Sequence, residues 1–462
     1  MSSSQGRFAL AVVLSSLLAA SFAVAVRFAL AAGNEALFGS PDVLDAARAL
    51  PWGVRLLAPA VGAAIGAAVA VASERLPASH GVGGVMEAVV LGRGRVSLRA
   101  ALAKTASSLP AIAGGGSLGR EGPVIQVAAA LGGTVAGWFR LDPLQTRTLY
   151  AAGTAAGFAA AYNTPLAATL FVVEVVVGVL AVELIVPVAV AAAIATMLTR
   201  AALGDAPIFG VRTYALVTTP QLASSVLLGP LAGVAGAGFM ALLFHGERFF
   251  AKLTVPRPVR AASGGLVVGA LATQLPEITG NGAEAIREML DGRVLGLMFV
   301  ALLIAKPLAT TASVSSGSAG GVFTPSMFLG AALGGGLSSI FLDGAGADRV
   351  PVVGACALVG MASVVAATTH APLMASVLAF EMSGDYALVV PLLLSTALAT
   401  TVARRLWPDS IYSAELRRRG IAWDDSLRRR LTDATVATHA SQATGAVDAP
   451  PTTDATDETH PP

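Results

Sequence analysis

The sequence predicts an all-α membrane protein that crosses the bilayer many times. Hydrophobic residues make up 55% of the 462 residues, charged residues only 13%, and the mean hydropathy is +0.73. A soluble domain carries about 25% charged residues. The apolar runs are continuous, which disfavours a β-barrel. Gly and Pro interrupt them, often before the roughly 20 residues that a spanning helix needs, so we expect broken, re-entrant helices.

Charge and cysteine content exclude several other classes. The net charge is +2, and no basic cluster with interleaved aromatic residues indicates a nucleic-acid partner. The single cysteine, Cys356, lies in an apolar run, so a disulfide within the chain is excluded and a thiolate metal site is not expected. We therefore expect a lipid-embedded protein without cofactor or metal.

The expected membrane segments fill a transmembrane domain at residues 1–407. The first apolar run continues past a signal-like Ala23-Val24-Ala25 to Ala32, which favours an uncleaved first helix. Half-helices are expected at 79–92 and 280–291, and a basic connector at 93–104. The other expected spans are 8–32, 52–73, 147–161, 165–182, 183–202, 220–246, 259–274, 294–311, 325–341, 351–368, 371–383 and 386–406.

Two halves of this domain repeat, at about 34–202 and about 220–406. Matching residues recur in the same order, 201 to 207 residues apart. The pairs are Gly81 with Gly282, Gly119 with Gly321, Asn163 with His370, and Glu174 with Glu381. Paired segments interrupted by Gly and Pro are typical of transporters built from two inverted-topology repeats, with a binding site at the bilayer midplane.

The C-terminal part has a different character. A basic helix is expected at 408–430, followed by a disordered tail at 431–462 with too little apolar surface to fold. Arginines in this region and Arg7 near the other end predict that both termini are cytoplasmic. No soluble regulatory domain is expected after the membrane part.

The most distinctive motif is Gly119-Arg120-Glu121-Gly122-Pro123. Proline suits the first turn of a helix, so Glu121 lies where a helix begins and where free N–H groups can bind an anion. Further glycine-opened helix starts are expected near Gly81 and Phe323. A carboxylate at Glu121 would compete with the anion for these donors, and its protonation would free the site. The Tyr412 hydroxyl is a possible additional donor.

These residues resemble the chloride channel (CLC) family, in a prokaryotic-type form without CBS domains. The resemblance covers about residues 8–420 and rests on the Glu121 motif, Gly321-x-Phe323-x-Pro325, Asn163 to Glu174, and Tyr412. It implies a homodimer with one anion pathway per subunit, in a prokaryotic plasma membrane. It also implies that Glu121 is the gate and that chloride binds the backbone amides of Val322 and Phe323 and the Tyr412 hydroxyl.

Two departures from the family pattern bear on mechanism. The first anion-binding loop of the family usually reads Gly-Ser-Gly-Ile-Pro or a close variant. This chain has Ser79-His80-Gly81-Val82-Gly83 there, so His80 replaces the serine and Gly83 replaces the proline. We still count His80 and Gly81 as chloride-binding candidates. Family exchangers commonly carry a proton-transferring glutamate just after the position of Glu174, where this chain has Val175. Val175 favours a passive, voltage- or pH-gated chloride channel, with a chloride/proton antiporter as the alternative.

Other readings concern residues with reactive or charged side chains. Ser318 in Gly317-Ser318-Ala319-Gly320, together with His370, allows an intramembrane serine protease, which we consider the weaker hypothesis; the expected protein is not an enzyme. A different solute carrier is a further alternative. The recurrence of Glu174 and Glu381 favours packing or hydrogen-bonding roles, and Lys306 is expected to snorkel or pair.

Overall fold

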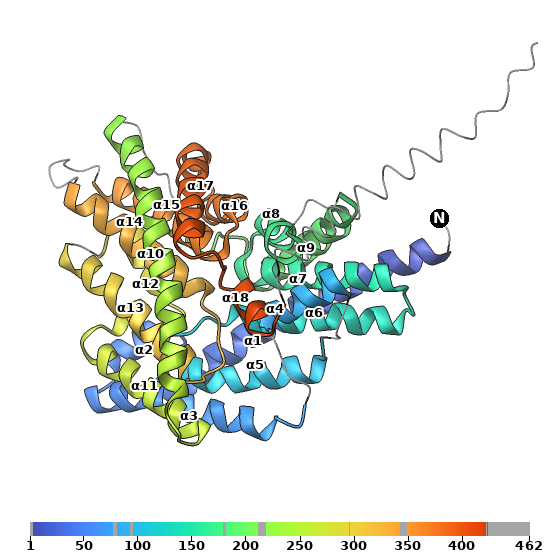
Figure 1. The fold of residues 1–462 in the computed structure, drawn as a ribbon, viewed down its shortest axis with the longest axis horizontal. Helices are drawn as coiled ribbons and strands as arrows, with labels where there is room; N and C mark the ends of the chain where they lie inside the picture. The colour runs from blue at the N-terminus through green and yellow to red at the C-terminus, as the bar shows by residue number, and fades with distance from the viewer. Residues whose placement is uncertain are drawn as a thin grey trace, which may run out of the picture. The chain divides into compact units, whose positions relative to one another are not determined.

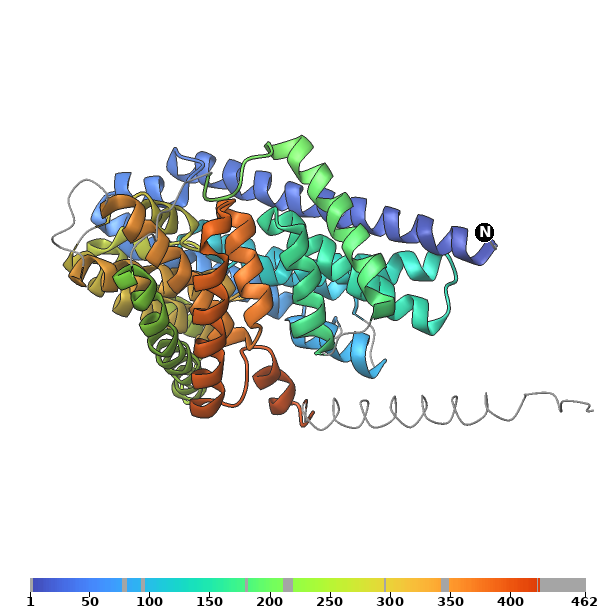
Figure 2. The same ribbon diagram turned by 90° about the horizontal axis from the view of Figure 1, so that it is seen from above.

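The computed structural model describes residues 3–76, 81–92, 96–178, 182–210, 219–294, 296–341, 349–421 and 423. These residues form helices joined by short turns (Figures 1 and 2), and no β-strand occurs within those ranges. Seven of their helices are long and apolar enough to cross a membrane. The all-α, multi-pass fold class is therefore confirmed. The chain divides into two units, Met1–Glu415 and Leu416–Pro462, and the membrane part belongs to the first.

Among the described residues, the first half of the membrane part contains nine α-helices, two of which continue as π-helices. They are α1 (Ser3–Phe38), α2 (Val43–Ala49), α3 (Trp52–Ala72), α4 (Gly81–Met86) with η1 (Glu87–Leu91), α5 (Leu98–Ala113), α6 (Glu121–Trp138), α7 (Pro143–Tyr162), α8 (Pro165–Phe171) with η2 (Val172–Val177), and α9 (Val182–Leu203).

The second half follows the same order of long and broken helices. It comprises α10 (Thr219–Ala251), α11 (Arg257–Gln274), η3 (Pro276–Ile278), α12 (Ala283–Leu290), α13 (Leu297–Ser315), α14 (Phe323–Phe341), α15 (Arg349–Thr369), α16 (Pro372–Ser383), η5 (Tyr386–Leu388) and α17 (Val389–Leu406), with α18 (Ser413–Arg418) after it.

Local sequence explains the helix starts, including one that differs from expectation. Asp142 accepts a hydrogen bond from the Gln145 N–H, and Pro143 occupies the first helical position of α7. Ser97 caps α5 in the same way, accepting from the Ala100 N–H. The expected basic connector at 93–104 is therefore wrong from Leu98 onward, because the arginines and Lys104 mask a helix that continues to Ala113.

The two halves are related by reciprocal contacts, as an approximate two-fold axis requires. The Glu174 carboxylate accepts hydrogen bonds from the N–H groups of Leu373 and Met374 at the start of α16, at 3.2 and 2.6 Å. The Glu381 carboxylate does the same for the start of α8, which lies beside α16 in Figure 1. Acidic groups at helix N-termini are stabilising. The inverted-repeat architecture and the hydrogen-bonding role of both glutamates are confirmed.

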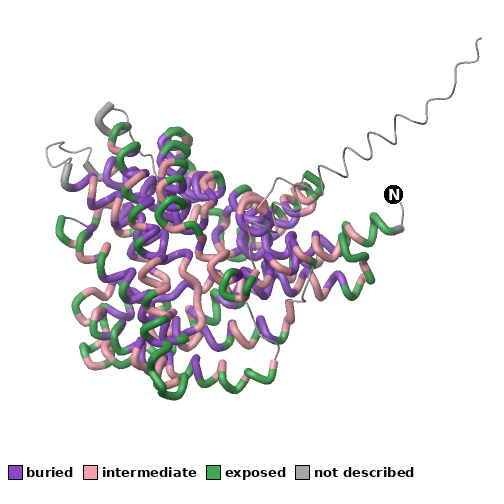
Figure 3. The backbone as a smooth tube through the Cα atoms, in the orientation of Figure 1, coloured by how far each residue is buried: buried purple, intermediate pink, exposed green. Residues whose placement is uncertain are grey.

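The core lies around α15, whose residues 352–369 are all buried and which packs against α14 and α17. Figure 3 shows buried residues along the inner helices and exposed residues along the outer ones. Close helix approach depends on small residues: a Cβ on Gly334 would lie 1.9 Å from the Cys356 carbonyl oxygen. The proposed tail at 431–462 lies outside the described residues, and the boundaries of the repeats stay predictions.

Candidate functional site

The loop before α6 places Glu121 in the protein interior. Gly115 adopts a positive φ of 86°, which suits glycine, and turns the chain after α5. Ser117 then fastens the loop: its N–H donates to Ser313 Oγ at 3.2 Å, and its hydroxyl bonds Thr310 at 2.9 Å. As predicted, Glu121 is the first residue of α6, and it is only 3% exposed.

A two-residue bridge joins this loop to its counterpart in the second half. The Gly119 N–H donates to the Gly321 carbonyl at 2.7 Å, and the Gly321 N–H donates to the Gly119 carbonyl at 2.6 Å. Phe323, the first residue of α14, follows two positions later. The starts of α6 and α14 are thus held next to each other, and the first N–H groups of a helix have no acceptor within it. The bridge therefore concentrates anion-binding donors at one place.

The Glu121 carboxylate lies against the bridge between Gly119 and Gly321. Its Oε1 accepts a hydrogen bond from Asn281 Nδ2 at 3.2 Å. Its Oε2 is buried and has no hydrogen-bond partner among the described residues. A Cβ placed on Gly119 would lie 2.4 Å from Oε2, so only a glycine leaves room for the carboxylate here. The side chain is therefore folded back over the start of its own helix.

Aromatic rings connect Phe323 to Tyr412. The Phe323 ring lies 5.6 Å from Phe158 and 5.4 Å from Tyr162, measured between ring centroids. Phe158 stacks on Phe171 at 4.6 Å, and Phe171 meets the Tyr412 ring edge-on at 5.8 Å. Residues far apart in sequence are thus brought into one continuous cluster.

The start of α4 has an acidic neighbour that the sequence did not reveal. Gly81 has a φ of +59°, and a Cβ on it would lie 3.3 Å from Glu415 Oε2 and 3.4 Å from Lys104 Nζ. A Cβ on Gly83 would lie 3.2 Å from the same Glu415 oxygen. The candidate residue His80 lies outside the described residues. The α4 start is therefore lined by a carboxylate as well as by its own amides.

Among the remaining candidates, Val322 is half-buried, and Val175 in η2 is 4% exposed. Of the two roles expected for Lys306, snorkelling or pairing, its burial excludes snorkelling. It is fully buried and donates to the carbonyls of Ile278 and Gly280, at 2.8 and 2.9 Å. These two bonds fix the loop before α12, which carries Asn281. Asn281 itself was missed, although it precedes Gly282 just as His80 precedes Gly81.

The protease hypothesis requires a hydrogen-bonded nucleophile and base. Ser318 Oγ and His370 Nε2 are both buried, and neither has a hydrogen-bond partner among the described residues. His370 instead adopts a left-handed φ of 60° between α15 and α16, and its carbonyl accepts from Arg404 at 3.1 Å. The geometry gives this hypothesis no support.

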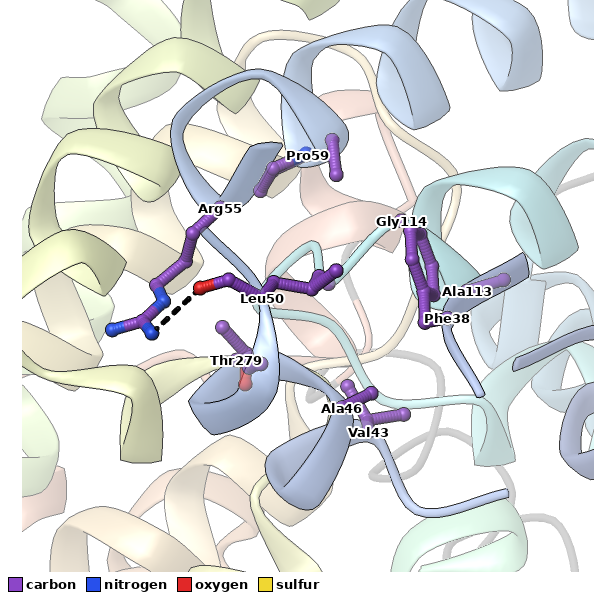
Figure 4. Close-up of a pocket in the computed structure, with 12 residues that line it drawn as sticks. Phe38, Val43, Ala46, Leu50, Arg55, Pro59, Ala113, Gly114 and Thr279 are labelled. Atoms are coloured by element: carbon purple, nitrogen blue, oxygen red, sulfur yellow. Dashed lines mark hydrogen bonds between the residues drawn. The ribbon is translucent and has the colours of Figure 1, made fainter. Parts of the chain in front are cut away.

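Two cavities lie away from Glu121 and from the bridge between Gly119 and Gly321. A small one of about 20 Å³ is lined mostly by apolar residues of α1 to α3 and the end of α5, with Arg55 donating to the Leu50 carbonyl at its edge (Figure 4). This volume accommodates about one water molecule. An open cleft of about 410 Å³ is lined by Glu174, His370, Thr400 and Arg404, among others. Its lining combines charged and polar side chains with apolar ones such as Pro372 and Ala397.

Fold and site together define a multi-pass membrane protein of two inverted halves, whose broken helices meet with their N-termini around a buried glutamate. The family described as "Voltage gated chloride channel" matches residues 61–404. The chain belongs to this voltage-gated chloride channel (CLC) family.

Individual relatives agree with this assignment. A ClcB-like protein of Ralstonia nicotianae is 37% identical over 390 residues, covering 83% of this chain and 89% of that protein. The voltage-gated ClC-type chloride channel ClcB of Escherichia coli is 33% identical over 382 residues, covering 81% and 89%.

Solved structures share the fold. A slow cyanobacterial Cl⁻/H⁺ antiporter superposes with a TM-score of 0.78 at 23% identity, covering 89% of this chain and 98% of that one. A CLC-type fluoride/proton antiporter superposes with a TM-score of 0.72 at 22% identity, with the same coverage.

Proposed function

We propose that this protein transports chloride across a membrane through a pathway that Glu121 gates. The observation that carries the proposal is the Glu121 carboxylate, buried against the bridge that joins the starts of α6 and α14. A carboxylate in that place puts its negative charge beside helix N-termini, which favour an anion. Protonation removes that charge, so the N-termini are then left to a transported anion.

The chloride site in this proposal consists mainly of backbone amides. Val322 and Phe323 supply amides at the start of α14, Gly81 supplies one at the start of α4, and the Tyr412 hydroxyl and His80 are side-chain contributors. Amides bind a monovalent anion without a full positive charge, which would hold it too tightly for rapid passage. The aromatic cluster that joins Phe323 to Tyr412 supports this arrangement, because it fixes both residues relative to Phe171.

Coupled chloride/proton exchange is the better supported mechanism. The two solved structures described above are named as proton antiporters, and the open cleft beside Glu174 is lined in part by charged and polar side chains. The channel interpretation drawn from Val175 therefore becomes the second candidate. It rests on that buried valine, which leaves no acid at the position where family exchangers commonly have one.

The proposal extends to the protein's surroundings. We place it as a homodimer in a prokaryotic plasma membrane, with both termini cytoplasmic. Chemical crosslinking in native membranes that yields only monomers would remove the dimer from the proposal.

Reconstitution into liposomes tests the gate. Chloride efflux through the unmodified protein is expected to rise as the pH falls, and Glu121→Gln is expected to remove that dependence. Glu35→Gln changes an exposed glutamate of α1 and is the matched control. Retention of the normal pH dependence in Glu121→Gln would refute the gating role. A reversal potential measured under opposed chloride and pH gradients then separates the mechanisms: it follows both gradients in an exchanger and chloride alone in a channel.

A further inference from the structure

The loop before α12 is built to hold one side chain still. Gly280 and Gly282 both have positive φ values, 60° and 89°, and they flank Asn281. Lys306 donates to the Gly280 carbonyl at 2.9 Å, and the Leu118 N–H donates to the same carbonyl at 3.2 Å. The loop that carries Asn281 is thus bonded directly to the loop that carries Glu121.

The orientation of the Asn281 amide follows from its neighbours. Its Oδ1 accepts a hydrogen bond from the Ala283 N–H at 3.1 Å, at the start of α12. A backbone N–H can only donate, so the oxygen of the amide must face it, and the NH₂ group must face the other way. That group points at Glu121 Oε1, 3.2 Å away. Among the described residues, Asn281 is the side chain that donates a hydrogen bond to the Glu121 carboxylate.

Several titratable or charged groups surround Glu121 without such a bond. They are Arg120, which directly precedes α6, Tyr162 on α7, Lys306 on α13 and Tyr412 before α18, with Glu284 of α12 facing Lys306. Lys306 is committed to two backbone carbonyls, and the Tyr162 hydroxyl bonds Thr324 Oγ1 at 3.1 Å. These groups contribute to the electrostatic potential around the Glu121 carboxylate, whereas Asn281 is hydrogen-bonded to it.

We propose that Asn281 is a positioning residue of the gate. Its amide holds the ionised Glu121 carboxylate in its buried position, and this contact sets the pH at which the anion pathway opens. This inference rests on the proposed gating function of Glu121. A donor stabilises the ionised form of a carboxylate over the neutral form. Without the Asn281 donor, the ionised Glu121 carboxylate is less stable in its buried position, so the anion pathway opens at a higher pH.

The sign of the effect is therefore defined. Loss of the Asn281 donor is expected to move the half-activation pH of chloride efflux upward and to raise efflux at neutral pH. A hydrogen bond to a charged group changes an equilibrium constant by about tenfold or more. A tenfold change corresponds to a shift of about one pH unit.

Two substitutions separate this role from the capping of α12. Asn281→Asp keeps an oxygen for the Ala283 N–H but replaces the donor facing Glu121 with an acceptor. Asn281→Ala removes both the oxygen that accepts from the Ala283 N–H and the donor that faces Glu121. Because the φ of Asn281 is not positive, alanine fits its backbone conformation. Both variants are expected to shift the half-activation pH upward by about one unit or more. Each Asn281 variant is also combined with Glu121→Gln. The double variants are expected to show the same efflux as Glu121→Gln alone.

The outcomes distinguish failure of this inference from failure of the gating proposal. If Glu121→Gln itself retains the normal pH dependence, the gating proposal fails. If Glu121→Gln loses it while both Asn281 variants keep the normal half-activation pH, the positioning role is overturned and the gate stands. A shift that persists unchanged in the Glu121→Gln background also overturns it. Should the aspartate variant fail to assemble, by size-exclusion chromatography, the alanine variant decides.

Discussion

Gly119 and Gly321 occupy equivalent positions in the two halves and exchange both of their backbone hydrogen bonds, at 2.7 and 2.6 Å. A residue thus pairs with its own repeat counterpart, which is possible only on or near a two-fold axis. The axis therefore passes close to the place where α6 and α14 begin. Since Glu121 and Phe323 each lie two positions after these glycines, the symmetry of the fold places the gate and the proposed anion donors together.

The first prediction concerns Gly119→Ala. The new Cβ would lie 2.4 Å from Glu121 Oε2 and 3.1 Å from the Gly321 carbonyl oxygen. The side chain of Glu121 is more easily displaced than the backbone bridge, so we expect the carboxylate to leave its buried position. Chloride efflux should then become nearly independent of pH. Gly321→Ala is the matched control, because its Cβ would meet Gly119 and Gly122 at 3.4 Å, an ordinary contact. A Gly119→Ala protein with normal pH dependence would show that the carboxylate does not need the space above Gly119.

The second prediction uses the reciprocal glutamates. Glu381→Ala leaves the N–H groups of Leu166 and Ala167 without their acceptor, and Glu174→Ala does the same to Leu373 and Met374. Hydrogen bonds to charged groups contribute about 1.5–3 kcal/mol. We expect each variant to lose about 2 kcal/mol of stability, seen as a lower Tm in detergent. Exposed Glu35→Ala should leave Tm unchanged, and a loss in only one of the two variants would show that the halves are not energetically equivalent.

The sequence was sufficient for these symmetric features because they depend on local spacing. Glycines and prolines that start helices recur in both halves, so the positions of Glu121 and Phe323 could be predicted without a structure. The helix at Leu98–Ala113 could not, since Arg99 and Lys104 interrupt its first turns and its later apolar positions are spaced among Ser and Thr.

Asn281 and Glu415 were missed for a different reason. Asn281 lies 160 positions from Glu121 in the chain, and nothing local distinguishes it from an ordinary turn asparagine. Its role arises only when the chain folds and the turn before α12 meets the start of α6. Glu415 likewise acquires its place beside Gly81 only through the fold.

The third prediction concerns Lys306. Its buried ammonium donates to the carbonyls of Ile278 and Gly280 and lies 5.1 Å from the centroid of the Phe328 ring. Methionine has a similar shape but no donor, so Lys306→Met leaves both carbonyls short of a partner. We expect a loss of about 2 kcal/mol, because the lost bonds are partly offset by no longer burying a charge. The loosened loop should also raise the half-activation pH of efflux.

Lys252→Met serves as the comparison for that experiment, because Lys252 is exposed at the end of α10. It should change neither the Tm nor the half-activation pH. A Lys306→Met protein as stable as the unmodified one would mean that these carbonyls need no ammonium partner.

The fourth prediction tests Tyr412 as a chloride ligand. Tyr412→Phe removes only the hydroxyl and keeps the ring contact with Phe171 at 5.8 Å, so the fold should be preserved. The hydroxyl would donate to an anion, and such a bond is worth enough to weaken chloride binding roughly tenfold. Isothermal titration calorimetry with chloride measures this directly, with exposed Tyr386→Phe as control. Because the amides of Val322 and Phe323 remain, weakened rather than abolished binding is expected. An unchanged Kd would restrict the site to the backbone and leave Tyr412 a packing role against Phe171.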